Sequence, residues 1–183
     1  MKIARTPIDG VVVGENTAFT DKRGMFTRLF CASDLAPIMG SRQIVQVNKS
    51  RTVTVGAARG LHYQRPPRAE MKFVTCLKGR IWDVAVDLRA GSATFLQWHA
   101  EELRASNGRM LIIPEGCAHG FQVIEADSEI LYLHTAPYDP AAEGGVQVSD
   151  PLLSIHWPLP IRDLSERDKA HPLLPRNFEG IPL

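Results

Sequence analysis

The sequence lacks an excess of either charge and lacks a long apolar run, and each absence excludes a class of function. Its 183 residues carry 21 basic and 20 acidic side chains, a net charge of +1, so no basic tract can follow a nucleic-acid backbone or an anionic membrane. No apolar segment approaches the roughly 18 residues of a membrane span, and the opening MKIARTPIDG has no apolar centre typical of a signal peptide. We therefore expect a cytoplasmic protein without nucleic-acid or membrane partners.

Cysteine is also scarce. Cys31, Cys76 and Cys117 are odd in number and far apart, which excludes a disulfide framework and a C-x-x-C motif. A chain of this length buries roughly 70% of its unfolded surface on folding, so it needs no crosslink. We expect all three cysteines to be small side chains of the core.

Helical periodicity is rare, and strand-like runs recur along the chain. Only SDLAPIM, with Ser33 as cap, and SERDKA, with Ser165 as cap, predict short helices. The strand-like runs, separated by turn residues, are GVVVGE, RQIVQVNKS, MKFVTCL, RIWDVAVDL, TFLQWHA, RMLIIP, GFQVIE and EILYLHT. The pattern predicts a single all-β domain over residues 1–183, a sandwich or barrel with short flanking helices. The proline-rich segment from about residue 151 is expected to wrap around it.

Two of these runs place polar side chains on one face. The two-residue period of a strand puts Gln46, Asn48 and Ser50 together, and it puts Tyr132 on the same face as His134. Such faces are explained by a sheet exposed to solvent. They are also explained by a barrel interior in which water or a ligand satisfies the polar groups.

The stretch GRMLIIPEGCAHGFQV has the glycine, proline, Glu-Gly and histidine spacing of the second cupin motif. This resemblance implies a small jelly-roll β-barrel. A metal-binding cupin also needs an H-x-H pair and a glutamate in its first motif, because catalytic metals take about three protein ligands. Here His62 stands alone in LHYQ, and Val123 occupies the last ligand position of the second motif. We therefore expect no metal.

Motifs spread over residues 20 to 170 resemble one family, the dTDP-4-dehydrorhamnose 3,5-epimerases and their nucleotide-sugar relatives. They are DKRGMF, QVNKS, RGLHYQ, MKFVTCLKGRIWDVAVDLR, GSATF, IPEGCAHGF, LYLHTAPYDP, DPLLSIHWP and LSERD. The resemblance implies a cofactor-independent, metal-free epimerase. Its substrate would be a nucleotide-diphosphate 4-keto-6-deoxy sugar, inverted at C3 and C5 by removal of a proton from one face and its return on the other.

The resemblance also assigns catalytic residues. His62 resembles the family's base, which suits an imidazole with a reference pKa of about 6.5, and Asp168 resembles the carboxylate paired with it. Tyr132 resembles the proton donor, and Lys72 resembles the cation beside the keto oxygen, where negative charge develops. His119 resembles a substrate contact. The spacing of Asp168 from Ser165 is also that of a helix cap, so a purely structural role for Asp168 remains open.

The remaining matches resemble contacts to the nucleotide. Arg23 and Arg59 stand at diphosphate positions, and Tyr138 stands where an aromatic ring stacks on the base. The further matched positions are Gln46, Val47, Asn48, Glu143 and Arg167. Family members are homodimers that share N-terminal strands, so the resemblance implies that Arg23 serves the neighbouring subunit.

One position departs from the family. Relatives usually read RGxFxE, with the glutamate on the thymine, whereas RGMFTR puts Arg28 there. The nucleotide that carries the sugar, CDP, GDP or dTDP, is therefore open. So are a C3-only epimerase, a ketoisomerase, a metal cupin enzyme and a non-catalytic sugar-nucleotide binding module.

Overall fold

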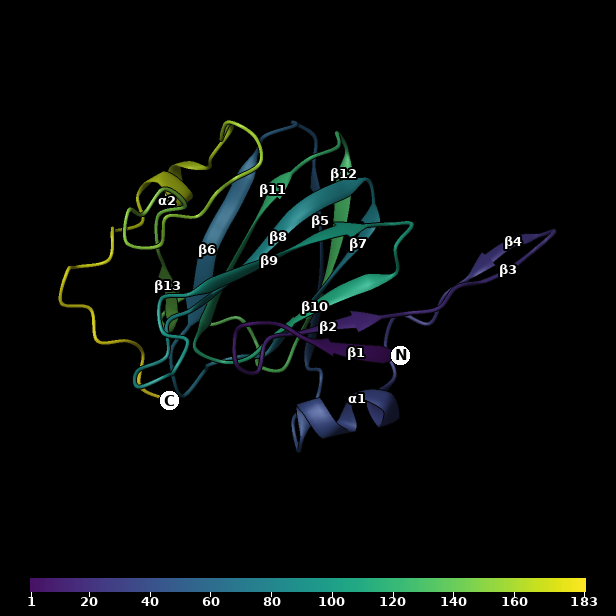
Figure 1. Ribbon diagram of the computed structural model, residues 1–183, viewed down its shortest axis with the longest axis horizontal. Helices are drawn as coiled ribbons and strands as arrows, with labels where there is room; N and C mark the ends of the chain where they lie inside the picture. The colour runs from purple at the N-terminus through teal and green to yellow at the C-terminus, as the bar shows by residue number, and fades with distance from the viewer.

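The computed structural model describes all 183 residues and forms two antiparallel sheets packed face to face (Figure 1). The first sheet contains, in spatial order, β1 (Lys2–Arg5), β2 (Val12–Glu15), β10 (Arg109–Ile113), β7 (Lys72–Lys78), β12 (Ser128–His134) and β5 (Gln46–Thr52). The second contains β13 (Glu143–Gly145), β6 (Ala58–Gln64), β11 (Cys117–Val123), β8 (Arg80–Asp87) and β9 (Trp98–Arg104). Sequence neighbours such as β5 and β6 lie in different sheets, so successive strands cross from one layer to the other.

The space between the sheets holds the main apolar core. Alternation along each strand supplies it: Val74 of β7 and Leu111 of β10 point inward from the first sheet, and Ala85 of β8 and Phe121 of β11 point inward from the second. All four are nearly inaccessible to solvent. Because the strand period is two, the residues between them face outward and need cover of their own.

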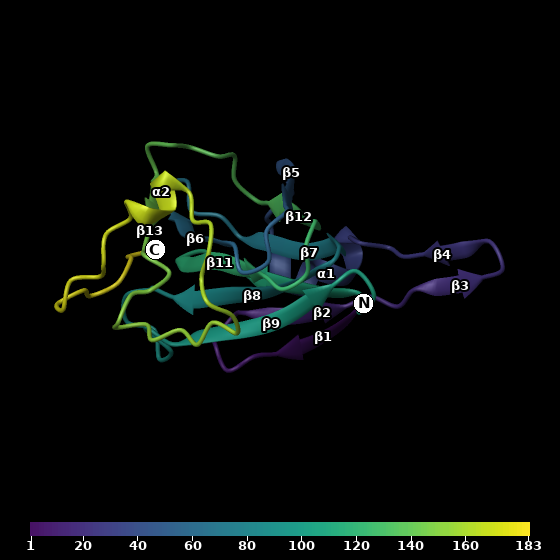
Figure 2. The ribbon, with the colours of Figure 1, turned by 90° about the horizontal axis from the view of Figure 1, so that it is seen from above.

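Two further layers cover those outer faces. The helix α1 (Ala32–Met39) packs Leu35 and Met39 against Phe73 and Ile112 on the outside of the first sheet. Segments after β13 pack on the outside of the second sheet, where Leu153 belongs to the same apolar cluster as strand residues of β6 and β8. This C-terminal region includes the short helix α2 (Glu166–Lys169), which lies beside β6 (Figures 1 and 2).

A hairpin near the N-terminus stands apart from these layers. It consists of β3 (Phe19–Asp21) and β4 (Gly24–Phe26), which pair only with each other. It projects from the body of the molecule as an arm (Figures 1 and 2). The exposed fractions of Phe19, Met25 and Phe26 are 69%, 64% and 67%, so the arm presents apolar side chains that this chain does not cover.

The all-β prediction is confirmed, and each strand-like run of the sequence contains a strand. Ser165 caps α2 as predicted, since its side chain accepts a hydrogen bond from the backbone N–H of Asp168. The Ser33 cap is wrong: Cys31 precedes α1, and Ser33 lies inside the helix. Cys31 is also only partly buried, unlike the core residues Cys76 and Cys117. No helix in the structure has the length and apolarity needed to cross a membrane.

Candidate active site

A cavity of about 300 Å³ opens between the sheets where β5 and β12 oppose β6, β11 and β13. It collects ten of the predicted site residues: Gln46, Asn48, Arg59, His62, Lys72, His119, Tyr132, Tyr138, Glu143 and Arg167. The polar faces of β5 and β12 therefore line this cavity, which decides between the two explanations that the sequence left open. The buried polar groups there need partners, and most have one.

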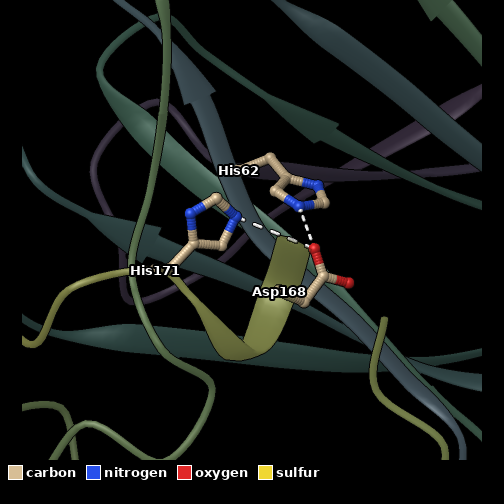
Figure 3. Close-up of side chains that lie close together, drawn as sticks. All are labelled: His62, Asp168 and His171. Carbon is tan, nitrogen blue, oxygen red and sulfur yellow. Dashed lines mark hydrogen bonds and ion pairs between the residues drawn. The ribbon is translucent and has the colours of Figure 1, made fainter. Parts of the chain in front are cut away.

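His62 and Asp168 form the first pair. His62 lies on β6, and its Nε2 is 2.7 Å from Oδ1 of Asp168 (Figure 3). Asp168 lies on α2, 106 residues later in the chain. Arg167 Nη2 also lies 3.3 Å from this nitrogen, but a guanidinium has only donors, so the N–H of Nε2 belongs to Asp168. Nδ1 makes no hydrogen bond within the protein and is left with its lone pair.

The environment of this pair keeps the ring neutral and the carboxylate charged. Burial lowers the pKa of His62 below its usual value, an effect that Asp168 opposes and that Lys72 and Arg167 reinforce. Burial alone would raise the pKa of Asp168, but hydrogen bonds from His62, from the Gly60 N–H and from Ser165 hold it below its usual value. His62 is therefore a neutral imidazole with one free lone pair, the state of a general base.

Tyr132 approaches from the other sheet. It lies on β12, and its hydroxyl is 2.9 Å from Ser50 Oγ on the paired strand β5. Burial raises the pKa of Tyr132 well above the ordinary phenol value, and the bond to Ser50 opposes this only in part. The phenol therefore keeps its proton at neutral pH and is available as an acid.

Lys72 belongs to a buried network with two residues that sequence reasoning left out of the site. Its Nζ lies 3.2 Å from Glu70 Oε1 and 3.3 Å from the carbonyl oxygen of His62. Glu70 also accepts from His134 Nδ1 at 2.7 Å, and His134 Nε2 is 3.3 Å from Asn48 Nδ2. Burial opposes ionisation of Glu70, but His134 and Lys72 hold its pKa below the usual value. The ammonium of Lys72 is thus fixed at the cavity wall.

His119 and Asp83 form a second, deeper pair. His119 on β11 is the register partner of His62, and its Nε2 lies 2.8 Å from Asp83 Oδ1 on β8. Asp83 is fully buried and its Oδ2 has no partner. Burial raises the pKa of Asp83, against the opposing effects of His119 and Lys72. The Asp83 carboxylate touches no solvent and does not line the cavity.

The mouth of the cavity carries the predicted nucleotide contacts. Tyr138 is about half exposed and donates through its hydroxyl to Glu143 at 3.0 Å, and Arg167 reaches the same carboxylate at 3.3 Å. Gln46 accepts from the Tyr138 backbone N–H, and Arg59 donates to Thr52 Oγ1 at 3.0 Å. An aromatic face and two guanidinium groups therefore surround the opening.

Four predicted site residues are not part of the cavity lining: Asp168, which contacts the lining residue His62, and three that lie away from it. Arg23 sits on the turn of the arm, where it pairs with Asp21, and Arg28 is exposed between the arm and α1. Val47 lies on the outer side of β5, 57% exposed, as the period of two requires when Gln46 and Asn48 face inward. Within one chain, none of the three reaches the opening.

Sequence reasoning missed several cavity or partner residues: Ser50, Glu70, Asp83, His134 and His171. Three carried a usable signal. Ser50 shares a strand face with the predicted site residues Gln46 and Asn48, and His134 shares one with Tyr132. Asp83 alternates with the apolar Ile81 and Ala85, so it points into the core. Glu70 and His171 lie in irregular segments, where no period predicts a direction.

The chain matches the sequence model of a family described as dTDP-4-dehydrorhamnose 3,5-epimerase over residues 5–176. A protein of that name from Sinorhizobium fredii is 40% identical over 167 residues, 89% of this chain and 86% of its own length. A Streptomyces niveus protein named dTDP-4-dehydrorhamnose 3-epimerase is 37% identical, over 95% of this chain and 84% of its own.

Solved structures agree with these matches. The 3,5-epimerase from Legionella pneumophila, in complex with dTDP-4-keto-L-rhamnose, superposes with a TM-score of 0.89 at 39% identity, over 94% of this chain and 92% of its own. The predicted cupin-like jelly roll is confirmed by this likeness, and by the sheets described above. The chain belongs to the dTDP-4-dehydrorhamnose 3,5-epimerase family, a family of isomerases.

Proposed function

We propose that this protein epimerises a nucleotide-diphosphate 4-keto-6-deoxyhexose at C3 and C5, without a cofactor. One observation carries the proposal: a base and an acid line the same cavity from opposite sheets, His62 from β6 and Tyr132 from β12. Inversion beside a ketone requires removal of a proton on one face of the sugar and delivery on the other. Two such groups on opposing walls meet that requirement.

The proposed chemistry starts at His62. Its Nδ1 lone pair takes the proton from the carbon next to the ketone, and the electron pair of the C–H bond moves into an enolate. Asp168, bonded to Nε2, stabilises the imidazolium that forms. Lys72, with His119 nearby, stabilises the charge on the keto oxygen. Tyr132 then donates its proton to the carbon on the opposite face. Proton exchange with solvent afterwards removes the extra proton from His62 and returns one to Tyr132.

The nucleotide is proposed to occupy the mouth of the cavity. Tyr138 offers an exposed ring for stacking on a base, and Arg59 and Arg167 supply guanidinium forks suited to a diphosphate. Gln46, Asn48 and Glu143 add polar groups along the same wall. Val47 contributes its backbone to this strand, since its side chain faces away.

We also propose a homodimer in which the arm reaches the neighbouring chain. Its uncovered Phe19, Met25 and Phe26 need an apolar partner surface, and Arg23 lies at its tip, outside the cavity of its own chain. A second copy of the chain would bury the arm and bring Arg23 to the diphosphate of the other site. This accounts for the distance of Arg23 from its own cavity.

Mixed dimers test this arrangement. Arg23→Ala and His62→Ala are each expected to be nearly inactive alone. Mixing them creates some dimers in which one site has both native residues, so activity should return to about a quarter of the native rate if the exchange is random. Absence of recovery, with subunit exchange verified, would place Arg23 in its own site or in none. Light scattering gives the mass of the particle.

The reaction itself is tested in deuterated water. The protein is incubated with several 4-keto-6-deoxy nucleotide sugars, and NMR locates the carbons that gain deuterium. Label at both C3 and C5 is expected. Label at C3 alone would support the second candidate, a C3-epimerase, which the 37% identity to the Streptomyces niveus 3-epimerase favours. If no carbon gains deuterium with any of these substrates, the protein would be a non-catalytic module that binds sugar nucleotides.

The preferred base is proposed to differ from thymine. If Arg28 enters the neighbour's base site, it brings a donor where the family's glutamate accepts the thymine N3 hydrogen. Mismatched polar groups cost on the order of 1 to 3 kcal/mol, or roughly ten- to a hundred-fold in affinity. Calorimetry with dTDP, CDP, GDP and UDP is expected to rank CDP or GDP first. If dTDP binds tightest, and Arg28→Glu leaves the order unchanged, this proposal is wrong.

A further inference from the structure

His171 occupies a position beside the His62–Asp168 pair that the proposed reaction does not use. It follows α2, its side chain is 13% exposed, and its Nε2 is buried without a hydrogen-bond partner. This nitrogen points at Asp168 Oδ1, 3.7 Å away, and the ring packs edge-on against the ring of His62 at a centroid distance of 5.3 Å (Figure 3). Two imidazoles therefore converge on one carboxylate oxygen.

The neighbouring strand is shaped to hold the ring of His171. Gly145 of β13 is the register partner of His62. A Cβ atom on Gly145 would lie 2.2 to 2.4 Å from three ring atoms of His171, a separation that real atoms do not tolerate. The space next to His62 that a side chain would normally fill is thus taken by the second imidazole. His171 is fixed in place by packing.

We propose that His62, Asp168 and His171 form an inhibitory binding site for a borderline divalent metal ion such as Zn²⁺. Their ligand atoms lie within 4.8 Å of one another. Two imidazole nitrogens and one carboxylate oxygen are donors that Zn²⁺ prefers, and three protein ligands leave a fourth position for water. Ligand atoms about 2.0 to 2.2 Å from a tetrahedral ion lie about 3.3 to 3.5 Å apart. The 3.7 Å between His171 Nε2 and Asp168 Oδ1 is already close to this separation, whereas His62 Nε2, 2.7 Å from the same oxygen, would have to move away from it.

This site differs from the metal position of cupins. Of its three ligands, only His62 comes from a segment that matches a cupin motif. His119 lies on β11, beside β6, and belongs instead to the separate pair with Asp83. Asp83 lies on β8, the strand on the other side of β11. The Zn²⁺ site proposed here uses the C-terminal segment, which supplies both of the other ligands.

Arg167 is the group that opposes metal binding. Its Nη2 lies 3.3 Å from His62 Nε2 and its Nε lies 3.8 Å from Asp168 Oδ1, so it would repel a cation there. Its side chain is 55% exposed and already contacts Glu143, toward which it can turn. Metal binding therefore competes with this guanidinium, and its removal should tighten the site.

The proton count explains why the metal would inhibit. A neutral imidazole carries one N–H, which in the free protein is on Nε2 and faces Asp168. When Nε2 binds the metal, the proton moves to Nδ1, the nitrogen whose lone pair removes the substrate proton. No net proton is lost, but the base is blocked. Only this inhibition rests on the proposed function; metal binding does not.

The first experiment measures binding of ZnCl₂ to metal-free protein by calorimetry, with Co²⁺ absorption spectra as a second readout. One ion per chain is expected, with d–d bands of a four-coordinate site. His171→Phe keeps a ring over Gly145 but removes a ligand, so affinity should fall at least about tenfold, as even indirect supports of a metal are worth 10- to 100-fold. Arg167→Gln should tighten binding. His156→Ala, which removes an exposed histidine elsewhere, should change nothing.

The second experiment measures turnover. Zn²⁺ should inhibit the native protein and a chelator should restore it, whereas His171→Phe should turn over without metal and need at least about tenfold more Zn²⁺ for half inhibition. Equal Zn²⁺ affinity in the native protein and His171→Phe would overturn the proposal. So would one bound ion that leaves turnover of the native protein unchanged, or loss of binding in His156→Ala alone.

Discussion

Two histidine–aspartate pairs on neighbouring strands have nearly the same bond and different surroundings. His62–Asp168 spans 2.7 Å and His119–Asp83 spans 2.8 Å. The side chain of His62 is 21% exposed to the cavity and its carboxylate comes from the C-terminal helix α2. Asp83 has no exposure and comes from the middle of β8. Bond length alone therefore does not reveal which pair transfers protons.

Solvation separates the two pairs. The Asp168 carboxylate accepts hydrogen bonds from His62 and from the Gly60 N–H, and its pKa is held below the usual value, so it can balance a positive imidazolium. Asp83 is desolvated, one of its oxygens has no partner, and its pKa is raised. A carboxylate that ionises with difficulty is a poor stabiliser of a transient cation. We therefore assign proton transfer to the first pair, and to the second a fixed polar contact between Asp83 and His119 that orients the His119 ring.

The largest effect is expected from removing the base. His62→Ala should lower incorporation of solvent deuterium by about 10²- to 10⁴-fold or more, because no other group replaces the Nδ1 lone pair. The fold and nucleotide affinity should persist, which circular dichroism and calorimetry check. Undiminished exchange would remove His62 from the mechanism, and the His62–Asp168 pair could then no longer be distinguished from the His119–Asp83 pair as the one that transfers protons.

A smaller loss is expected from Asp168→Asn, since the base itself remains. We expect the rate to fall by on the order of 10²-fold, because the amide cannot stabilise the imidazolium. The rate needs neutral His62, so activity falls as pH drops through the pKa of His62, which lies below 6.5. Asp168 raises that pKa, so the variant's acid limb should move to still lower pH. A pH–rate profile measures this, and an unmoved acid limb would contradict it.

Asp83→Asn is the matched control in the second pair. An asparagine oxygen still accepts from His119 Nε2, and a structural contact does not need the charge. We expect turnover to fall by less than about tenfold, well short of the loss in Asp168→Asn. A loss equal to that of Asp168→Asn would mean that His119 changes its protonation state during the reaction.

The sequence predicted these two pairs unequally. The resemblance to the family names His62, His119 and Asp168, but none of the strand-like runs covers β6, so the pairing of the strands that carry His62 and His119 was not predicted. Asp83 could have been found from alternation alone, because it stands between Ile81 and Ala85 on an inward face. The partnership of His62 with Asp168 could not, since 106 residues separate them and only tertiary packing brings α2 to β6.

The limits elsewhere have the same cause. Periodicity gives the face of a strand, so Gln46 and Asn48 were placed correctly as a polar face, but it does not say what covers that face. The irregular segments around Glu70 and His171 have no period, and their contacts are set by distant strands. The positions of Arg23 and Arg28 depend on a partner chain, which intrachain patterns do not describe.

The smallest effect, and the one that tests the electrostatic difference most directly, is the pH dependence of stability. In the folded state the pKa of Asp168 lies below the usual value of 3.8 for an aspartate. Folded protein then binds fewer protons than unfolded protein, so the stability from this group is fully present above about pH 3.8 and is lost as pH falls through the lower folded value. For Asp83 the folded pKa lies above 3.8, so folded protein binds more protons. Its contribution therefore declines as pH rises from about 3.8 through the raised value.

The two Asp→Asn variants should accordingly diverge from the native protein in opposite directions. Below about pH 3.8, the stability lost by Asp168→Asn relative to native protein should grow as pH rises and then level off. Above about pH 3.8, the difference for Asp83→Asn should shift in favour of the variant as pH rises. Urea unfolding at a series of pH values measures both, with equal m-values as the check that the unfolded states are comparable. Parallel pH curves for the two variants would mean that the carboxylates are equally solvated, and the distinction between a proton-transfer pair and a structural pair would then have to rest on kinetics alone.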